Sequence, residues 1–441
     1  MVEEARKPST GVAVIESIDH EGVGVAHVDG KVTFIEGGIT GERVAFARRR
    51  SRGSFDLATV TEVLTESSQR VRARCAYFGT CGGCAMQHVE PAAQVAAKQR
   101  VLEDNLARIG KVTPEAILPP VHGPSWGYRH RARLSVHFVA KKGGVLVGFH
   151  ERKSSFVADV RSCEVLPAAI SKLIVPLREM FTTMALRERL PQVELAVGES
   201  VTILVLRHLE PVGEEDCAKL RTFADRHGIQ WWFQPKGPDT AHPFYPEDSP
   251  ALDYRLPDFG VSIGFRPTEF TQVNMAVNRV LVRRAVDLLD PQPGERVGDL
   301  FCGLGNFTLA IASCGAQVVG MEGSATLTAR GEENARANGL QGNASFITYD
   351  LYADAPGALA RLGRVDKLLI DPPRDGAMEI CKALPDEGAP TRIVYVSCSP
   401  STLSRDAGVL VNVKGYRLLA AGVVNMFPHT GHVESIAVFS R

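Results

Sequence analysis

The sequence predicts an α/β protein with a Rossmann-like C-terminal domain, a small β-barrel at the N-terminus and an α+β domain between them. From about residue 263, short apolar strands alternate with helical stretches, a pattern typical of a mainly parallel sheet with helices on both faces. Residues 11–63 instead hold five short strands joined by tight turns. A chain of 441 residues is too long for one ordinary domain. We place the domains at residues 1–67, 68–262 and 263–441.

The N-terminal strands indicate a small closed barrel of the OB type, because they are short, numerous and evenly spaced. Their segments read GVAVIESI, GVGVAHVDG, KVTFIEG, ERVAFARRR and FDLATVTEVL. Asp29-Gly30, between the second and the third, is a strong signal for a two-residue hairpin turn. We expect the basic run Arg48-Arg49-Arg50-Ser51-Arg52 in the last loop of the barrel. There it either contacts RNA phosphates or forms an ordinary solvated surface.

The central region begins with a cysteine-rich and glycine-rich stretch, followed by a helical pattern at about residues 89–110. We expect this helix to end on Gly110 as its C-cap, and it is a candidate to pack on the C-terminal domain. The alternating segment YRHRARLSVHF places an arginine row on one strand face and apolar residues on the other. The row, which either follows phosphates or is the solvated side of a strand, consists of Arg129, Arg131 and Arg133.

Composition predicts an intracellular protein that is neither secreted nor embedded in a membrane. No apolar run is long enough to cross a bilayer, and the polar N-terminus has no apolar core of a signal peptide. The nine cysteines are unevenly spaced, unlike a disulfide framework, so we expect a reducing cytoplasm. The formal net charge is zero, yet residues 1–150 carry +5 and the remainder −5. An RNA-binding front half would have this distribution, although chance would also produce it, and we expect a monomer.

A nucleotide-type site is predicted at the carboxyl ends of the C-terminal strands. The segment DLFCGLGN follows an apolar strand and opens a helix, so Gly303 and Gly305 allow the backbone to approach a ligand closely. The next three strands end in Glu322, Asp350 and Asp371, where open α/β sheets bind their ligands. The segment has neither the third glycine of a dinucleotide fingerprint nor a P-loop lysine. An adenosyl group without a pyrophosphate therefore fits best, whereas helix capping is the alternative role for each single carboxylate.

Cys398 is the candidate nucleophile, because the strand TRIVYVS delivers it to the same edge of the sheet. A thiolate can add to carbon 6 of a pyrimidine, which makes carbon 5 nucleophilic enough to take a methyl group from a sulfonium donor. A base must then remove the hydrogen on carbon 5, and Glu434 in GHVES is the candidate. The alternatives are a buried structural cysteine and a glutamate in a salt bridge.

Four cysteines form a separate candidate metal site. Three lie close together with two glycines between the last pair, and the fourth follows much later in the chain. They are Cys75, Cys81, Cys84 and Cys163. Four thiolates with a single C-x-x-C pair can hold zinc or an iron–sulfur cluster. Structural zinc sites more often use two such pairs, so we favour an iron–sulfur cluster over zinc or free buried thiols.

Several C-terminal motifs together resemble the RNA uridine-5-methyltransferase family. They are EFTQVN, DLFCGLGNFTLA, IDPPRDG, VYVSCSP and HTGHVES, in the expected order. The resemblance implies a class I methyltransferase domain, with Cys398 as nucleophile and Glu434 as base. It also implies S-adenosyl-L-methionine as the cofactor, in contact with Gln272, Phe301, Asn306, Glu322, Asp350 and Asp371. One departure is Gly298, where the family usually has a bulkier apolar residue, and we expect it to loosen that strand.

The N-terminal half is similar to the ribosomal branch of this family, which carries a TRAM barrel and a [4Fe–4S] cluster. This implies 23S ribosomal RNA as the substrate, with the same methylation of transfer RNA or of a different ribosomal uridine as the alternative. Cytosine-5 RNA methyltransferases usually have a second cysteine after the Asp-Pro motif, where Arg374 stands here. A non-catalytic RNA-binding or redox-sensing iron–sulfur module is the alternative from another class, and the presence of both Cys398 and Glu434 argues against it.

Overall fold

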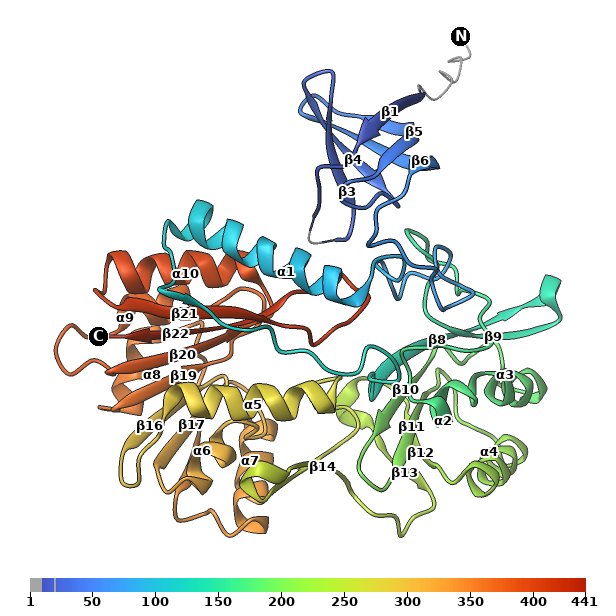
Figure 1. Ribbon diagram of the computed structural model, residues 1–441. Helices are drawn as coiled ribbons and strands as arrows, with labels where there is room; N and C mark the ends of the chain where they lie inside the picture. Colours follow the sequence, from blue (N-terminus) through green and yellow to red (C-terminus); the bar gives the residue numbers. More distant parts are fainter. Residues whose placement is uncertain (1–9, 20) are drawn as a thin grey trace.

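The computed structural model describes residues 10–19 and 21–441. Residues 1–9 of the predicted barrel lie outside this part. Figure 1 shows three bodies: the small barrel (blue) sits above a large α/β body that contains the C-terminus (yellow to red) and a second α/β body (green). Within the described residues no helix is both long and apolar enough to cross a membrane.

The N-terminal sheet has six strands where five were predicted, because the first predicted segment is divided into two strands. Its strands follow the order β1-β5-β6-β4-β3-β2. Their bounds are β1 (Thr10–Val14), β2 (Ser17–Ile18), β3 (Gly24–Val28), β4 (Lys31–Glu36), β5 (Arg43–Ser51) and β6 (Phe55–Thr65). β1 and β2 are nearly continuous, and they pair with β5 and with β3 respectively. The two ends of the sheet are therefore joined, which closes the barrel around a core that includes Ile35, Val44 and Phe46.

The position predicted for the basic run was wrong. Arg48–Ser51 belongs to β5 and pairs with β6, and only Arg52 lies in the turn. The chain reverses later than expected because Gly53 and Ser54 supply the turn. Within the strand, Arg48 forms an ion pair with Asp56 (3.1 Å) and Arg49 one with Glu36 (3.2 Å). Half of the run is therefore already neutralised inside the protein.

The middle body is a mixed six-stranded sheet with the order β13-β12-β11-β10-β8-β9. Its strands are β8 (Arg131–Val139), β9 (Gly144–Gly148), β10 (Gln192–Val197), β11 (Thr202–Arg207), β12 (Gln230–Gln234) and β13 (His242–Tyr245). The helices with it are α2 (Ala168–Ser171), α3 (Ile174–Thr183) and α4 (Glu214–His227), with the short 3₁₀ turns η2 (Ala140–Lys142) and η3 (Pro238–Thr240).

The two faces predicted for β8 are confirmed. Ala132, Leu134 and Val136 are buried, whereas the arginines lie on the other side. Two of the arginines have protein partners there: Arg133 forms an ion pair with Glu194 (2.8 Å), and Arg131 donates to the backbone oxygen of Glu269. The arginine row therefore braces neighbouring elements as well as facing outward.

The large body contains an eight-stranded sheet with the order β18-β17-β16-β19-β20-β22-β21-β7. Its strands are β7 (Ala116–Ile117), β16 (Arg296–Leu300), β17 (Gln317–Glu322), β18 (Ala344–Thr348), β19 (Lys367–Ile370), β20 (Arg392–Ser397), β21 (Arg417–Val424) and β22 (Glu434–Ser440). Five neighbouring strands of the sheet are parallel to one another: β18, β17, β16, β19 and β20. β22 runs antiparallel to both of its neighbours. Each strand predicted after residue 290 is present, so the mainly parallel α/β sheet is confirmed.

Helices cover both faces of this sheet, and one apolar core lies under each layer. On one face pack α5 (Met275–Leu289), α6 (Thr308–Ser313) and α7 (Ala325–Ala337). On the other pack α8 (Ala355–Leu362), α9 (Met378–Ala383), α10 (Pro400–Asn412) and, from far earlier in the chain, α1 (Pro91–Asn105). The hairpin of β14 (Leu252–Leu256) and β15 (Val261–Phe265), with the turn η4 (Pro257–Phe259) between them, packs on the first layer.

Residues before the predicted boundary at 263 thus complete the large body. The helix expected at about residues 89–110 packs on α10 and β21 through Leu102 and Leu106, and β7 extends the sheet beyond β21. The C-cap prediction was wrong: α1 continues as a π-turn (η1, Leu106–Gly110), and Lys111 adopts the left-handed conformation (φ 53°). Gly110 is required for another reason, because a Cβ there would collide with the backbone oxygen of Ser404 in α10.

Candidate active site

A cavity of about 650 Å³ lies at the carboxyl ends of the parallel strands, where sheets of this type bind ligands. All eight residues predicted for catalysis and cofactor binding line it. They are Gln272, Phe301, Asn306, Glu322, Asp350, Asp371, Cys398 and Glu434. Residues separated by up to 162 positions in the chain are therefore brought together at one site.

The glycine-rich turn after β16 shapes one wall of this cavity. Phe301, Gly303 and Gly305 all have positive φ values (62°, 55° and 97°), so the chain leaves the strand through a tight left-handed turn. The turn directs the backbone N–H of Gly303 to the Glu322 carboxylate (3.2 Å). The backbone N–H of Ser324 binds the other carboxylate oxygen (3.0 Å), so Glu322 is fixed at the end of β17.

Asn306 is oriented by a small buried network. Its Oδ1 accepts hydrogen bonds from the hydroxyl of Tyr254 (2.8 Å) and from Nδ2 of Asn278 (3.0 Å), and its Nδ2 donates to Oδ1 of Asn278 (3.1 Å). Tyr254 comes from β14, so the hairpin before the predicted boundary contributes directly to the cavity wall. The sequence alone did not indicate this residue, because its role depends on how the hairpin folds back.

An aromatic pair lies opposite the acidic residues. Oδ1 of Asp350 accepts hydrogen bonds from the backbone N–H groups of Tyr352 (2.9 Å) and Ala353 (3.0 Å), which forms a tight turn. This turn places the Tyr352 ring 5.4 Å from the ring of Phe301. Two adjacent aromatic faces provide a surface on which a planar base can pack. Tyr352 was not predicted, because neither its type nor its spacing sets it apart in the sequence.

Glu322 and Asp371 line the cavity, and the buried carboxyl group of Asp299 lies near both of them. Burial raises the pKa of Asp299 to about 7, and the nearby Asp371 and Glu322 add to the shift. Burial also raises the pKa of Asp371 to about 7. Asp299 accepts a hydrogen bond from Thr308 (2.5 Å) through one oxygen, and its other oxygen has no partner among the described residues. A cationic ligand would relieve this repulsion.

Cys398 and Glu434 lie in the same cavity, and both favour their protonated forms there. Burial raises the pKa of Cys398 to about 11, with Glu434 and Asp371 adding to the shift and Arg374 opposing it. Burial, helped by Asp371, holds the pKa of Glu434 well above its usual range. The mutual effect of the thiol and the two carboxyl groups reflects their proximity. Before any reaction, the cavity therefore holds a neutral thiol beside a neutral carboxyl group.

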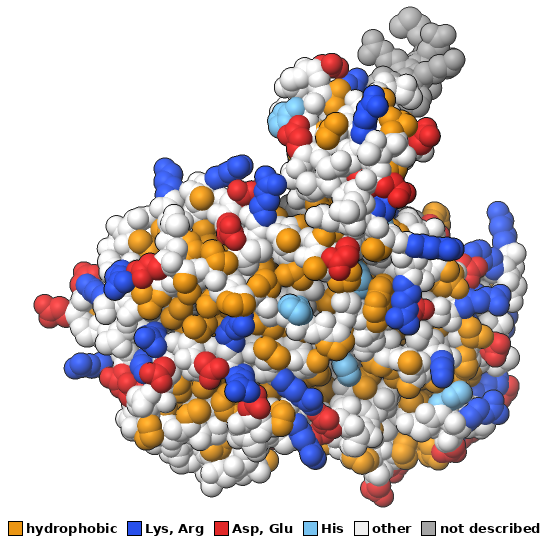
Figure 2. Space-filling view, viewed as in Figure 1, with side chains coloured by type: hydrophobic (Ala, Val, Ile, Leu, Met, Phe, Trp, Pro, Cys, Tyr) orange, Lys and Arg blue, Asp and Glu red, His pale blue; other side chains and the backbone are white. Residues whose placement is uncertain are grey.

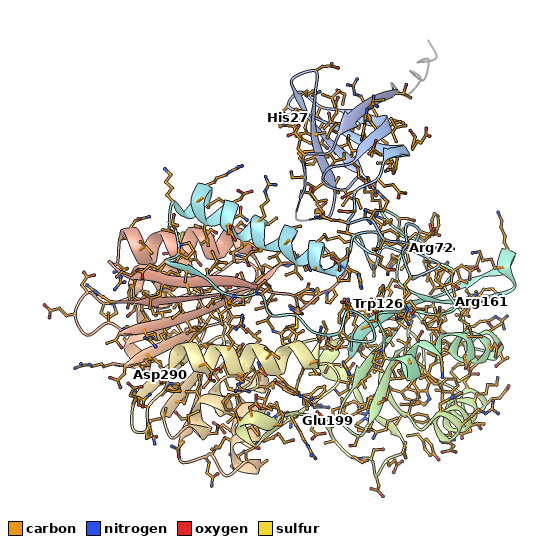
Figure 3. All side chains as sticks on the ribbon, viewed as in Figure 1. His27, Arg72, Trp126, Arg161, Glu199 and Asp290 are labelled. Atoms are coloured by element: carbon orange, nitrogen blue, oxygen red, sulfur yellow. The ribbon has the colours of Figure 1, made fainter. Side chains whose placement is uncertain are left out.

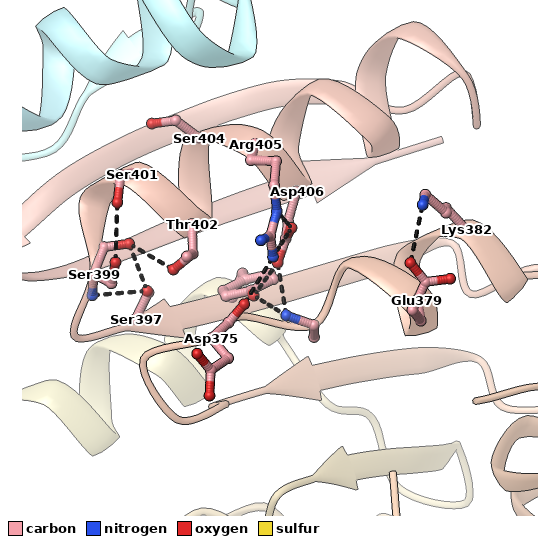
Figure 4. A network of polar contacts seen from close by, with 12 residues as sticks. Asp375, Glu379, Lys382, Ser397, Ser399, Ser401, Thr402, Ser404, Arg405 and Asp406 are labelled. Atoms are coloured by element: carbon pink, nitrogen blue, oxygen red, sulfur yellow. Dashed lines mark hydrogen bonds and ion pairs between the residues drawn. The ribbon is translucent and has the colours of Figure 1, made fainter. Parts of the chain in front are cut away.

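The turn that carries Cys398 is fixed by polar contacts from α10 (Figure 4). Ser397 accepts the backbone N–H of Ser399 (3.1 Å), so the chain turns sharply around the cysteine. Asp406, fully buried in α10, accepts hydrogen bonds from the Tyr395 hydroxyl and the backbone N–H of Ala377 (both 2.7 Å). It thereby joins β20 to the segment that follows the Asp371 motif.

Arg374, His432 and Phe270 also line the cavity, although none was predicted as a site residue. Nη2 of Arg374 lies 2.9 Å from Nδ1 of His432, so the guanidinium donates to a neutral imidazole. Phe270 exposes 68% of its surface at the cavity, which is unusual for so large an apolar side chain. A signal was present for all three, because Phe270 stands in the Gln272 motif, Arg374 in the Asp371 motif and His432 in the Glu434 motif.

The four cysteines of the candidate metal site surround a second, smaller cavity. Burial raises the pKa of Cys163 to about 11 and also raises the pKa of Cys81; the backbone N–H groups of Val165 and Leu166 oppose the shift at Cys163, and that of Gly83 opposes it at Cys81. Such donors favour sulfur that carries negative charge. Within the described residues, however, no group of three or more metal-binding side chains converges closely enough to hold an ion as it stands. Four thiols around one cavity are the ligands that an iron–sulfur cluster requires, but in this structure they lie too far apart to share one ion.

Comparison with known proteins gives a consistent result. A family model described as tRNA (Uracil-5-)-methyltransferase matches residues 91–351. The chain belongs to the uracil-5-methyltransferase family. It is 61% identical to a 23S rRNA (uracil(1939)-C(5))-methyltransferase RlmD from Thiobacillus denitrificans, over 98% of this chain and 99% of that one. A protein of the same name from Aromatoleum aromaticum is 57% identical over 98% and 99%.

A solved structure shows that the fold agrees with this family. The chain superposes on the Pyrococcus abyssi tRNA (uracil-54, C5)-methyltransferase in complex with S-adenosyl-L-homocysteine with a TM-score of 0.73. The match covers 97% of this chain and all of the other, at 22% identity. In this uracil-5-methyltransferase the strand at Gly298 is not loosened, contrary to expectation. Leu368 and Leu362 fill the space, and a Cβ on Gly298 would come within 2.8 Å of Leu368.

Proposed function

We propose that this protein transfers a methyl group to carbon 5 of a uridine in 23S ribosomal RNA. The observation that carries the proposal is that Cys398 and Glu434 share one cavity with the acidic and aromatic donor pocket. The choice of ribosomal RNA rests on full-length relatives at 57–61% identity, which are named as 23S rRNA uracil-5-methyltransferases. The activity requires an RNA partner and a methyl donor. We also propose that the protein acts in the cytoplasm as a monomer.

The proposed cofactor is S-adenosyl-L-methionine, which supplies the methyl group on a positively charged sulfur. Among the residues proposed to contact it, Glu322, Asp350 and Asp371 provide acidic or hydroxyl-binding groups. Phe301 provides an aromatic face, which Tyr352 extends. Gln272 and Asn306 provide amides at the cavity wall. The carboxyl groups that line the cavity support a cationic donor over a phosphate-bearing nucleotide, because a cation stabilises their ionised forms and a phosphate does not.

The proposed reaction uses two residues of the chain in sequence. Cys398 reacts as the thiolate, after its proton has passed to solvent, and its sulfur forms a bond to carbon 6 of the uracil, so that electron density moves to carbon 5. Carbon 5 takes the methyl group, and the bond between that methyl group and the donor sulfur would break to leave a neutral thioether. Glu434 must also have lost its proton before the last step: its carboxylate removes the remaining hydrogen from carbon 5 as a proton, the double bond between carbons 5 and 6 re-forms, and the sulfur of Cys398 leaves as thiolate. The base must leave its stack to reach both groups, so we expect the uridine to be flipped out.

Two substitutions test these roles, because they stop the reaction at different points. Cys398→Ala removes the nucleophile, so neither methylated uridine nor a covalent RNA adduct should form. Glu434→Gln keeps the shape of the side chain but cannot readily take a proton. The enzyme should therefore accumulate cross-linked to methylated RNA, visible as a band that resists denaturation. Normal turnover by Glu434→Gln, in a folded protein that binds RNA, would contradict its role.

The RNA specificity is tested by mapping 5-methyluridine in cells with and without the protein. Loss of one modified position in 23S RNA, with transfer RNA unchanged, is the expected result. Loss confined to transfer RNA would replace the ribosomal assignment by the transfer-RNA alternative. Loss in neither RNA would refute uridine-5 methylation as the function.

We further propose that Cys75, Cys81, Cys84 and Cys163 hold a [4Fe–4S] cluster, and that the barrel is a TRAM domain that contributes to RNA binding. The arrangement of four thiols around one cavity supports the cluster, as do the backbone N–H groups directed at two of the sulfurs. Protein purified without oxygen should be brown and contain about four iron atoms per chain, the number in such a cluster. Stoichiometric zinc without iron would overturn the cluster assignment.

A further inference from the structure

Helix α1 holds the segment that directly precedes the proposed base, Glu434. This segment, residues 425–433, joins β21 to β22 and ends immediately before Glu434; we call it the base loop. Phe427 and His432 of the base loop line the active-site cavity together with Glu434. The position of the loop therefore determines where the Glu434 carboxyl lies.

Gln94 of α1 is the first of two buried polar contacts to the base loop. Its side chain is only 1% exposed, and Oε1 accepts a hydrogen bond from the backbone N–H of His429 (2.8 Å). Its Nε2 donates to the backbone oxygens of Met86 (3.0 Å) and Val89 (2.8 Å), and it lies 3.1 Å from Nδ1 of His429. One amide thus joins the base loop to the segment that follows Cys84.

Lys98 makes the second contact one helical turn later, on the same face of α1. It is only 2% exposed, and its Nζ donates to Oδ1 of Asn425 (2.8 Å) and to the backbone oxygen of Phe427 (2.9 Å). Among the described residues no carboxylate forms an ion pair with Lys98, and burial lowers its pKa to about 7. A buried lysine without an acidic partner reduces stability, so this position is not explained by packing alone.

The base loop needs such support, because its backbone is strained. His429 has a φ of 65°, in the left-handed region that side chains other than glycine adopt only at a cost. Its ring stacks on Trp126 at 3.9 Å, and Figure 3 places Trp126 between the two large bodies. Its carbonyl oxygen accepts hydrogen bonds from the N–H groups of Ala85 (2.8 Å) and Met86 (3.0 Å). These two residues directly follow Cys84, so the cysteine-rich segment and α1 hold the same loop.

We propose that Gln94 and Lys98 are positioning residues that hold the base loop, and with it Glu434, in the geometry required for proton removal. Because Gln94 also binds Met86, it couples the cysteine-rich segment to the base. The proposal rests on the proposed function, since it assigns these residues to one step of that reaction. Cys398 and several donor-pocket residues instead lie at the ends of β16 to β20, and the side-chain hydrogen bonds of Gln94 and Lys98 go to the base loop and to Met86 and Val89.

The structure therefore predicts a selective defect. Gln94→Met keeps a similar volume but removes the hydrogen bonds that the Gln94 side chain makes to the base loop and to Met86. Attack by Cys398 and methyl transfer should continue, whereas proton removal should slow. We expect kcat to fall by about tenfold or more, with the KM for RNA and for the donor changed by less than about threefold. Lys98→Met should give the same pattern, and Arg100→Met, at an exposed position of the same helix, should behave as wild type.

Three measurements on full-length protein separate positioning from general damage. The first is the yield of denaturation-resistant, methylated RNA adduct, which should rise in Gln94→Met as in Glu434→Gln. The second is the affinity for S-adenosylhomocysteine, which should stay unchanged. The third is the iron content, which should also stay unchanged, because Gln94 contacts the backbone after Cys84 and not the sulfurs. Gln94→Glu retains the acceptor for the His429 N–H and should recover part of the lost kcat.

The proposal is overturned if Gln94→Met and Lys98→Met turn over normally. It is also overturned if adduct formation falls together with kcat, because the defect would then precede proton removal. If Gln94→Met does not fold, Gln94→Glu and Lys98→Met decide by the same two criteria. Failure of the proposed function differs from both cases: wild-type protein would then produce no 5-methyluridine, and Glu434→Gln would form no adduct.

Discussion

At the scale of single residues, the cavity and the core beside it concentrate groups that are costly for the folded state. Asp299, Asp371 and Glu434 are carboxyl groups whose pKa values burial raises, and Cys398 is a thiol shifted in the same direction. Such groups reduce stability near neutral pH, because the folded chain resists their ionisation. Their presence at one site, beside backbone at positive φ, is consistent with selection for binding and chemistry over stability.

Asp299 offers a direct measurement of this cost. Its pKa is about 7 in the folded chain and near 3.8 when unfolded, so the folded state binds a proton more tightly. The contribution of Asp299 to stability is therefore most favourable at low pH and is lost as pH rises from about 4 to 7. Asp299→Asn should raise the free energy of unfolding by on the order of 2 kcal/mol above pH 7.

This gain should shrink toward pH 4, where the native aspartic acid is also neutral. Thermal melting of both proteins across this pH range gives the comparison. Thr308 still has an acceptor in the asparagine, so loss of its hydrogen bond does not confound the result. A stabilisation that is the same at every pH would show that ionisation of Asp299 is not the cause.

At the scale of elements, alternation and glycine placement made most of the catalytic sheet predictable. Each strand from β16 to β20 is a short, largely apolar run between turn residues, which is typical of a parallel sheet covered on both faces. The carboxyl ends of these parallel strands must meet at one edge, which is why the residues Glu322, Asp350, Asp371 and Cys398 at or just after the strand ends were predicted together.

What escaped prediction depends on contacts between distant segments. The two residues of β7 join the sheet only because β21 is there to pair with them, and nothing in Ala116–Ile117 itself signals a strand. Tyr254 and Tyr352 reach the cavity through the folding of a hairpin and a turn. The end of α1 was misplaced because a glycine at a helix terminus is commonly a C-cap, whereas Gly110 serves helix packing instead.

The crossing of α1 and α10 gives a prediction at this scale. Gly110 lies against the backbone oxygen of Ser404, and a Cβ on Gly408 would come within 2.8 Å of the Gly110 oxygen. Gly110→Ala must therefore separate two helices, at a cost of about 2–4 kcal/mol, since backbone atoms cannot give way locally. Denaturation by urea should reveal the loss.

Gly342→Ala is the matched control. Gly342 lies in a turn outside the left-handed region, and a Cβ there would meet no atom within 4 Å. Its substitution should leave the denaturation midpoint nearly unchanged. Equal losses in the two variants would mean that the α1–α10 crossing tolerates a wider spacing than the structure indicates.

At the scale of the whole molecule, positive charge is spread over the surface. Figure 2 shows Lys and Arg side chains distributed over the barrel, α1 and the middle body, with Asp and Glu among them. Between the barrel and the middle body lies a cavity lined by Arg49, Arg70, Arg72 and Arg152. Three of these form ion pairs with Glu36 or Glu42. We therefore expect RNA binding to use contacts from more than one body.

Arginines at the end of β5 and in the turn after it test how much the barrel contributes. Arg48 and Arg49 form ion pairs, whereas within the described part of the chain Arg50 and Arg52 have no carboxylate partner. An arginine already paired with a carboxylate releases few counterions when it meets a phosphate. Replacing Arg50 and Arg52 together by Gln should therefore lower the slope of log affinity against log salt by about 1–2.

Replacing Arg48 and Arg49 should change the slope less and should lower barrel stability, because Asp56 and Glu36 lose partners. If neither pair alters the slope, the phosphate contacts lie outside β5, and Arg72 at the junction with the middle body is the next residue to replace.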